Sequence, residues 1–268
     1  EELGVEIKTD TPVKRLEDTF NQGYKAVFIA TGAWLSQKIG TQGEGAKGVI
    51  YALDFLKQVN SGMKVNLGKR VAIVGGGSVA IDAARSALRL GAKEVHLICL
   101  ECRDLTSKDR MLAQEREIEE AEEEGVIIHP CLGIRRIVTK DEMVAGLETI
   151  VCVSVRDEDD TFAPRFREGT APTIEADNVI IAIGQAVDRS MLPGGLRYTA
   201  GGTVAVDPVT LQTSIKGVFA GGDVVAGAAD IISAIAAGKE AAISIDRYLS
   251  GVDLKQGRRL PAKGVRER

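Results

Sequence analysis

The stretch RVAIVGGGSVAIDAARSALRLGAKEVHLICLE, residues 70–101, constrains the fold of this chain more than any other part of the sequence. A hydrophobic segment rich in β-branched residues runs into three glycines and then into an alanine-rich segment that ends at Gly91. This order predicts a buried strand over 70–74, a tight turn, a helix over 79–90 and a second strand over 95–100. Such strand–helix–strand units build parallel sheets, so the sequence predicts an α/β fold.

The glycines between the first strand and the helix fit the pattern G-x-G-x-x-G/A at Gly75, Gly77 and Ala80. The first position permits the tight turn, the second lets the backbone approach a pyrophosphate, and the third allows close packing of helix on strand. The helix N-terminus offers free N–H groups and the positive end of its dipole to an anion. We therefore expect a dinucleotide to bind at this turn, at Gly75, Gly76, Gly77, Ser78, Val79 and Ala80. A turn that binds nothing is the alternative interpretation.

Two charged residues at the end of the second strand bear on which dinucleotide is bound. Glu101 follows the glycine turn by roughly 25 residues, where a carboxylate can accept both ribose hydroxyls and would repel a 2′-phosphate. Arg103 could instead contact such a phosphate. The sequence therefore favours NAD over NADP and leaves NADP open.

The segments on either side of this unit are each too small to form a domain. Further strands are predicted at VEI (5–7), KAVFIATG (25–32), GTVAVD (202–207) and KGVFAGGD (216–223), with helices over 49–60, 108–124 and 229–249. Within the central region, 147–160 is expected to form part of an antiparallel excursion, and DNVIIAIGQ (177–185) a buried strand. We predict a nucleotide-binding domain over 66–183, inserted into one outer domain that is formed by 1–65 and 184–250. The basic segment 251–268 is predicted to be a frayed end or a linker.

Composition excludes several classes of partner. The formal net charge of the 268 residues is −4 and no basic stripe is present, so nucleic acid is not expected to bind. No apolar run approaches the roughly 18 residues of a membrane span. Four cysteines without a secreted-type framework indicate a reducing, cytoplasmic setting. The chain opens EELGVEIKTD, without methionine, which suggests a piece of a longer protein.

A second, incomplete ligand site is predicted in the outer segments. Strands there end in Ala30-Thr31-Gly32 and in Gly221-Gly222-Asp223, which bring backbone and an acceptor side chain close to a ligand. The first turn of the last helix could direct its amides at the pyrimidine carbonyl of a flavin. The candidate cofactor-binding residues outside the glycine turn are Ala30, Thr31, Gly32, Ile183, Gly184, Gly222, Asp223, Asp230, Ile231, Ile232 and Ser233.

Five stretches in a fixed order, YKAVFIATGA, GVIYALDFLKQVN, residues 71–101, DNVIIAIGQ and GVFAGGDVVAGAADIISAIAAGKEAA, resemble the pyridine-nucleotide–flavin oxidoreductases with two dinucleotide-binding domains. Within them the chain is most similar to the small (β) subunit of glutamate synthase and its relatives. The resemblance implies a Rossmann-like NAD(P)-binding domain inserted into a truncated FAD-binding Rossmann-like domain. It also implies hydride transfer from NAD(P)H to FAD, with electrons passed to an iron–sulfur protein or domain or to a larger synthase-type subunit.

The sequence departs from this family at two places, which bear on FAD binding and on the choice between NADH and NADPH. The FAD-type glycine motif would precede residue 1, so we expect the chain to bind NAD(P)H better than FAD. The sheet edge that this leaves open could pair two copies as a homodimer. In CLECRDLTS, Leu100 and Glu101 stand where relatives often carry two basic residues, which again favours NADH.

Two other functions stay open. Cys99 and Cys102 form a C-x-x-C that could serve a flavin-dependent disulfide reductase, and a nucleotide-binding scaffold subunit without catalysis is also possible. His96, His129 and Asp82 are interpreted as structural residues. No side chain stands out as a catalytic acid or base, which agrees with direct hydride transfer between two cofactors, and no metal ligand is predicted.

Overall fold

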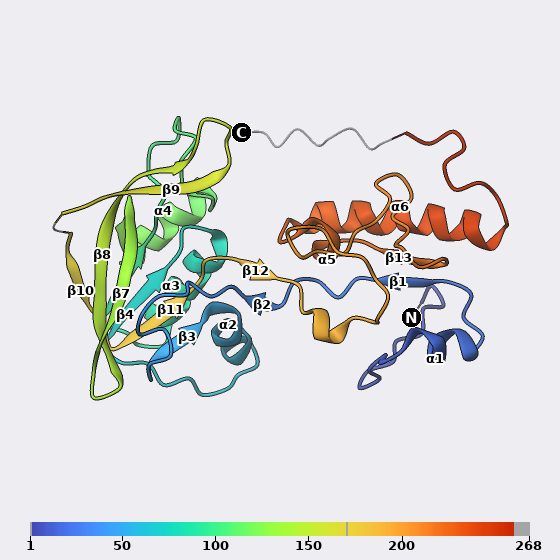
Figure 1. Cartoon of the computed structure of the whole chain (residues 1–268). Coiled ribbons are helices and arrows are strands. Elements are labelled where there is room, and N and C mark those ends of the chain that lie inside the picture. The colour runs from blue at the N-terminus through green and yellow to red at the C-terminus, as the bar shows by residue number, and fades with distance from the viewer. Residues whose placement is uncertain (1, 170, 260–268) are drawn as a thin grey trace. The chain divides into compact units, whose positions relative to one another are not determined.

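The computed structural model describes residues 2–169 and 171–259 (Figure 1). The chain divides into two compact units, Ser36–Gly184 and a unit formed by the flanking segments Glu1–Leu35 and Gln185–Arg268. One unit is therefore inserted into the other, but the predicted boundary near residue 66 is wrong. Residues 36–65 lie in the central unit because β3 (Val49–Tyr51) pairs with its sheet and Phe55 is fully buried in its core.

A five-stranded parallel sheet forms the centre of this unit, in the order β3, β11 (Asn178–Ile181), β4 (Arg70–Val74), β5 (Glu94–Ile98) and β6 (Ile127–His129). Alternate side chains of β4 point to opposite faces. Val71 and Ile73 pack with α2 (Ala52–Asn60), α3 (Ser78–Arg89) and α4 (Glu115–Glu123). The predicted strand–helix–strand unit over 70–101 is confirmed.

An antiparallel sheet covers the other face. It consists of β7 (Leu132–Lys140), β8 (Met143–Arg156), β9 (Phe162–Arg167) and β10 (Thr173–Glu175), with β8 paired to each of the other three. Leu147 of β8 and Ile174 of β10 share a buried core with Ala72 of β4 and Ile181 of β11. The antiparallel excursion that the sequence predicts is therefore the layer that buries the second face of the parallel sheet.

The outer unit has a smaller core around two parallel strands, β1 (Val27–Ile29) and β13 (Val218–Ala220). Its core side chains are supplied by both flanking segments, among them Leu16, Ile29, Val204, Val218 and Val224. The helices are α1 (Leu16–Asn21), α5 (Asp223–Ala226) and α6 (Ile231–Leu249), with a 3₁₀ turn at Arg189–Met191. Two short strands, β2 (Leu35–Ser36) and β12 (Gln185–Ala186), pair where the chain passes between the units.

Five local predictions are wrong. Residues 49–51, predicted as the start of a helix over 49–60, form the strand β3. Residues 5–7 form no strand, and Val5 and Ile7 are 60% and 67% exposed because no partner strand buries them. Residues 202–207 make only the isolated bridge Tyr198↔Val204. The helix predicted from 108 begins at Glu115, where Gln114 and Glu117 form a capping box. The segment after 251 is not frayed through residue 259, because Arg258 bonds to Glu240 and Ser244 of α6; residues 260–268 lie outside the described part.

Candidate functional site

The glycine turn lies at the carboxyl end of β4. Its first position, Gly75, has a backbone conformation and surroundings that only glycine tolerates. Gly75 has a φ of +138°, and a Cβ placed on it would lie 2.3 Å from the carbonyl oxygen of Ala182 at the end of β11. Its N–H donates to the carbonyl of Ile98 at the end of β5, at 2.9 Å. Gly75 therefore lets the ends of three neighbouring strands approach one another, as the sequence predicts for a tight turn.

Gly77 has a different reason to be glycine. It caps α3 with a φ of −95°, which any residue can adopt, and a Cβ placed on it would meet no heavy atom within 4 Å. No side chain caps the helix at this position. A side chain at Gly77 would thus project into open space, whereas the Ser78 hydroxyl in the first turn of α3 donates to Glu117 Oε2 at 2.7 Å. Ala80, fully buried, packs the helix onto the sheet. Open space above uncapped helix amides is what a dinucleotide pyrophosphate requires, so these residues fit that group.

Glu101 lies against the same turn. A Cβ placed on Gly76 would come within 2.6 Å of Glu101 Oε2. Burial raises the pKa of the Glu101 carboxyl above its usual range, and the positive charge of Arg156 opposes this only partly. The predicted ribose ligand is therefore a partly buried carboxyl beside the glycines.

The end of β11 completes this edge of the sheet. The Ala182 N–H donates to the carbonyl of Val74 at 2.8 Å, which places Ile183 and Gly184 in continuation of the strand next to the glycine turn. Ile183 is 39% exposed, and Gly184 has a φ of +131°. The structure thus brings the candidate residues of the central unit to one sheet edge, except Arg103.

Arg103 is not directed to a ligand but is held by α4. Its Nη2 lies 3.0 Å from Glu115 Oε1 and 3.1 Å from Glu122 Oε2, and its Nη1 donates to Glu115 Oε2 at 3.2 Å. The sequence did not reveal these partners, since their approach depends on how α4 packs.

A cavity of about 440 Å³ adjoins the glycine turn and was not predicted from the sequence. The amides of Leu112 and Ala113 donate to the carbonyl of Gly76 at 3.2 and 3.1 Å, which fixes the loop before α4 beside the turn. The lining residues are Leu105, Arg110, Met111, Leu112, Ala113, Gln114 and Glu115. The capping box that ends this loop has Gln114 at the N-cap and Glu117 at N3, and because glutamine is not among the preferred N-cap residues the sequence carries no clear signal for it.

In the outer unit, the parallel pairing of β1 and β13 brings the two predicted strand ends together. Val27 is opposite Val218 and Ile29 opposite Ala220, and the Gly221 N–H donates to the Ile29 carbonyl at 3.1 Å. Ala30-Thr31-Gly32 and Gly222-Asp223 therefore leave the same edge. A Cβ placed on Gly222 would lie 3.7 Å from the Cβ of Ala234, so the first turns of α6 adjoin this edge as well.

The N-terminus of α6 is only partly available to a ligand. Asp230 caps the helix by accepting the Ser233 N–H at 2.7 Å, so that amide is not free, contrary to the expectation from the sequence. Ile231 and Ile232 follow the cap and are 79% and 80% exposed. The amides that remain are those of the first helical residues after the cap.

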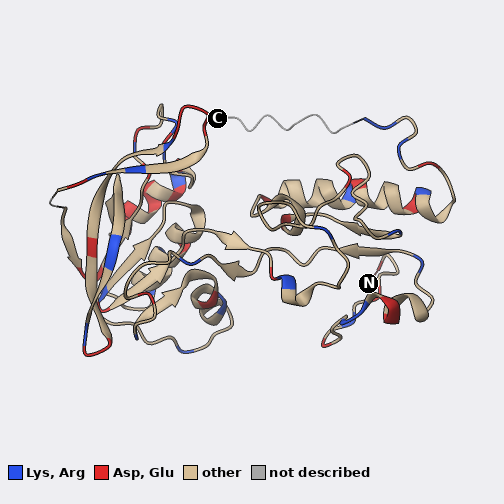
Figure 2. Cartoon of the chain, in the orientation of Figure 1, with Lys and Arg blue, Asp and Glu red and all other residues tan. Residues whose placement is uncertain are grey.

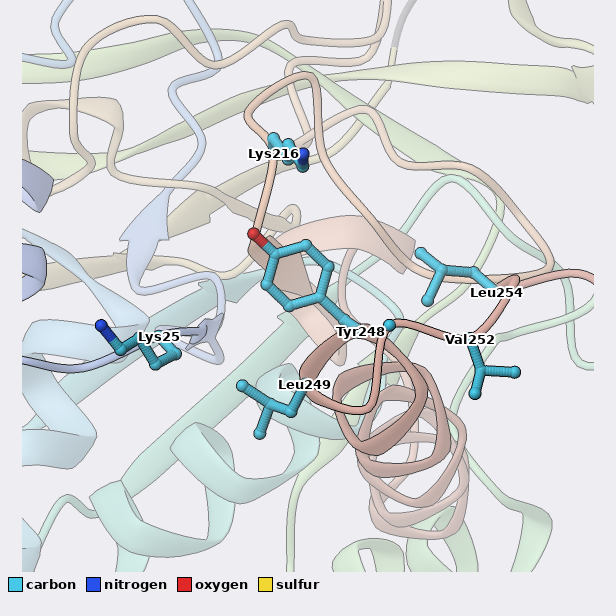
Figure 3. A pocket seen from close by; sticks show the side chains of 7 residues that line it. Lys25, Lys216, Tyr248, Leu249, Val252 and Leu254 are labelled. Atoms are coloured by element: carbon cyan, nitrogen blue, oxygen red, sulfur yellow. The ribbon is translucent and has the colours of Figure 1, made fainter.

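A larger hollow in the outer unit, of about 610 Å³, lies away from these strand ends (Figure 3). Lys25 and Lys216, which line it, precede β1 and β13, and the two strands are parallel. The hollow therefore lies at the amino ends of the strands, beside Tyr248 at the end of α6. Ligands of open α/β sheets bind at the carboxyl ends, so this hollow is not part of the candidate site.

Cys99 and Cys102 of the C-x-x-C motif lie in different surroundings. Cys99 is buried, its thiol donates to the Glu101 carbonyl at 3.5 Å, and burial raises its pKa well above the usual range. The Cys102 thiol is directed instead at the Asp104 carbonyl, at 3.9 Å. A thiol that resists ionisation is a poor nucleophile, which argues against a disulfide reductase using this pair.

The histidines, distant in sequence, meet in the structure. His96 Nδ1 lies 2.8 Å from His129 Nε2, which links β5 to the edge strand β6, and His96 Nε2 lies 2.8 Å from Glu94 Oε1. Burial lowers the pKa of His129. Across residues 2–169 and 171–259 no three His, Cys, Asp or Glu side chains are grouped as metal ligands would be. Asp82 lies on α3 at an exposed position.

Comparisons with known proteins agree with this geometry. The sequence pattern of a family described as "Pyridine nucleotide-disulphide oxidoreductase" matches residues 2–241. The chain is 43% identical over 256 residues to the beta subunit of NADP(+)-dependent formate dehydrogenase of Moorella thermoacetica, covering 92% of this chain and 35% of that protein. It is 35% identical over 244 residues to the glutamate synthase [NADPH] small chain of Azospirillum brasilense, covering 83% and 48%.

A solved structure shares the fold. Thioredoxin reductase of T. acidophilum superposes with a TM-score of 0.61 at 24% identity, covering 85% of this chain and 66% of that one. The predicted α/β, Rossmann-like class is confirmed. The chain spans less than half the length of the two curated relatives named above. In the described residues, no helix is both long and apolar enough to span a bilayer.

These findings settle the family but not the preferred dinucleotide. The predicted resemblance to the glutamate synthase small subunit is confirmed, and the family binds FAD and NAD(P). The expected preference for NAD is not supported, because both relatives carry NADP(+) or NADPH in their names. By sequence and by fold, the chain belongs to the pyridine nucleotide-disulphide oxidoreductase family.

Proposed function

We propose that this chain is the pyridine-nucleotide-handling part of an NAD(P)H-dependent flavoprotein oxidoreductase. The observation that carries the proposal is the open space beside Gly77, above the uncapped first turn of α3, with Glu101 lying against the same turn. An anion with an attached ribose matches both features.

Each group in the central unit would hold one part of the dinucleotide. The amides of Gly77, Ser78 and Val79 would bind the pyrophosphate, and Glu101 would accept the hydroxyls of the adenosine ribose. The cavity beside Gly76 would take the adenine, whose faces match apolar side chains such as Leu105 and Leu112. Ile183 and Gly184 would flank the nicotinamide half at the end of the neighbouring strand.

The outer unit would position the flavin. Thr31 and Asp223 lie at the ends of paired strands, where they can bond to the ribityl chain, and the amides after Asp230 can face the ring carbonyls. When both cofactors are bound, the reduced nicotinamide supplies a hydride to the flavin. The chain's own residues hold the rings in position and need supply no acid or base.

Within this proposal NADH is the preferred donor. Glu101 would repel a 2′-phosphate, and Arg103, which could attract one, is already paired with two carboxylates. We also propose an iron–sulfur protein or domain as the electron acceptor. Support comes from the relatives, which are named as the beta subunit of a formate dehydrogenase and the small chain of glutamate synthase.

The test is oxidation of NADH by the chain supplied with FAD and ferricyanide as the final acceptor. We expect oxidation that depends on FAD, that is lost in Gly77→Ala, and that persists in Lys25→Ala, a change in the hollow of the outer unit. Tight NADH binding without any oxidation at saturating FAD would instead indicate a nucleotide-binding subunit without catalysis. Absence of dinucleotide binding would refute the proposal.

A further inference from the structure

Arg103 is held by a clasp of two glutamates from α4, Glu115 and Glu122. Three contacts of 3.0 to 3.2 Å join its guanidinium to the two carboxylates. The Arg103 side chain is 29% exposed and Glu115 is 33% exposed, so the clasp is partly shielded from water. Figure 2 shows the acidic residues along α4.

The position of the clasp relates it to the glycine turn. Arg103 follows Glu101 by two residues in the loop after β5, and Glu115 lines the cavity beside Gly76. A 2′-phosphate on an adenosine ribose held by Glu101 would therefore enter the region that this loop bounds. Guanidinium groups bind phosphate through two parallel hydrogen bonds, and this arrangement needs two free N–H groups on the guanidinium.

The clasp blocks this use of Arg103 in two ways. Both Nη1 and Nη2 face carboxylate oxygens, so a phosphate approaching these two atoms would have to displace the carboxylates. The two glutamates also place two negative charges beside the positive charge of Arg103, which cancels the attraction that Arg103 alone would exert on a phosphate.

We propose that Glu115 and Glu122 are specificity-determining residues, which turn a latent 2′-phosphate ligand, Arg103, into a structural group and so exclude NADPH. The inference rests on the proposed function, because it concerns the dinucleotide bound at Gly75–Ala80. By this inference the discrimination between NADH and NADPH depends on residues of α4 as well as on Glu101.

Calorimetric titration with NADH and NADPH, comparing wild type with the E115Q/E122Q variant, tests it. We expect the ratio of NADPH affinity to NADH affinity to be at least tenfold higher for the variant than for wild type. The matched control is E119Q/E123Q, which removes the same charge from exposed positions of the same helix. The control should leave both affinities unchanged, and the triple variant R103Q/E115Q/E122Q should lose the gain for NADPH.

Several results would overturn the inference. These are equal behaviour of E115Q/E122Q and its control, a gain that survives in the triple variant, or wild type that binds NADPH as tightly as NADH. In each of these the chain still binds a dinucleotide, so the proposed function stands. If wild type and E115Q/E122Q bind neither NADH nor NADPH while their melting transitions are intact, the proposed function fails and the inference fails with it.

Discussion

At the scale of single residues, the glycine turn shows that adjacent glycines serve different purposes. Gly75 is required by the backbone, since its φ is positive and a side chain would collide with Ala182. Gly76 leaves room for the Glu101 carboxylate, and a Cβ on Gly77 would meet no protein atom within 4 Å. The carboxyl of Glu101 is therefore kept in a partly dehydrated position where a ribose, rather than another side chain, would satisfy it.

Glu101→Gln tests this residue. The folded-state pKa of Glu101 is raised above the ordinary 4.5, so above pH 4.5 the folded chain binds more protons than the unfolded chain. Its stability contribution is therefore lost as pH rises from 4.5 through the folded-state pKa. We expect Glu101→Gln to raise the free energy of unfolding at pH 7. We also expect it to weaken NADH binding at least tenfold, because a charged hydrogen bond contributes about 1.5–3 kcal/mol. Urea unfolding at pH 4 and 7, with calorimetry, measures both. A variant of unchanged stability and affinity would contradict the assignment.

At the scale of elements, the site depends on how β4 and β11 begin. The Asp177 carboxylate accepts the N–H groups of Lys69 and Arg70, both at 2.9 Å, and pairs with the Arg70 guanidinium at 2.8 Å. Asn178 accepts the Gly68 N–H at 2.7 Å. These bonds set the register at the amino ends of the strands and so bring Gly75 and Ala182 together at the other end.

Asp177→Asn should therefore destabilise the central unit by roughly 1 kcal/mol at pH 7, because partial exposure to solvent weakens these charged hydrogen bonds. The hydrogen bond from Arg70 lowers the pKa of Asp177 below the ordinary 3.8, so this stabilisation is present above pH 3.8 and lost as pH falls below it. Glu175→Gln is the control, because Glu175 pairs with the same arginine but is 76% exposed. Urea unfolding at pH 7 and pH 3 should separate the two variants more at pH 7 than at pH 3, and an equal loss in both variants at pH 7 would contradict this role of Asp177.

At this scale, the sequence predicted those elements whose signal lies within one short stretch of the chain. The order of strand, three glycines, helix and strand over 70–101 predicted that unit and the place of Glu101 within it. The three-residue strand β3 carries too little local signal to show that it pairs with β11, more than a hundred residues away, so residues 36–65 were assigned to the wrong unit. The partners of Arg103 were likewise beyond prediction, because they depend on the packing of α4 after a loop that resembled a helix.

At the scale of the whole molecule, the two units have separate cores. Both core clusters of the central unit draw only on residues between 36 and 184, and the core of the outer unit draws only on the flanking segments. The ends of the central unit are adjacent, since the Gln37 N–H donates to the Gly184 carbonyl at 3.0 Å. Adjacent ends and a hydrophobic core formed only by its own residues are typical of an inserted domain that folds alone.

The segment 36–184 should therefore unfold in one cooperative transition and bind NADH as the full chain does. The segment 66–184 is the matched control, since it lacks β3 and the buried Phe55 of α2 and should be far less stable. Differential scanning calorimetry of both segments measures this. A segment 36–184 without a cooperative transition, or a segment 66–184 of equal stability, would contradict the domain boundary that the structure gives.

The central claim is that Gly77 marks a cradle for a dinucleotide, and titration of wild type and Gly77→Ala with NADH tests it most directly. The alanine meets no protein atom and needs no unusual backbone angle, so the melting temperature should not change. We predict saturable binding by wild type and a loss of at least tenfold in affinity for Gly77→Ala, because its methyl group occupies the space of the pyrophosphate. A stable Gly77→Ala chain that binds NADH as tightly as wild type would show that the dinucleotide, if bound, lies elsewhere.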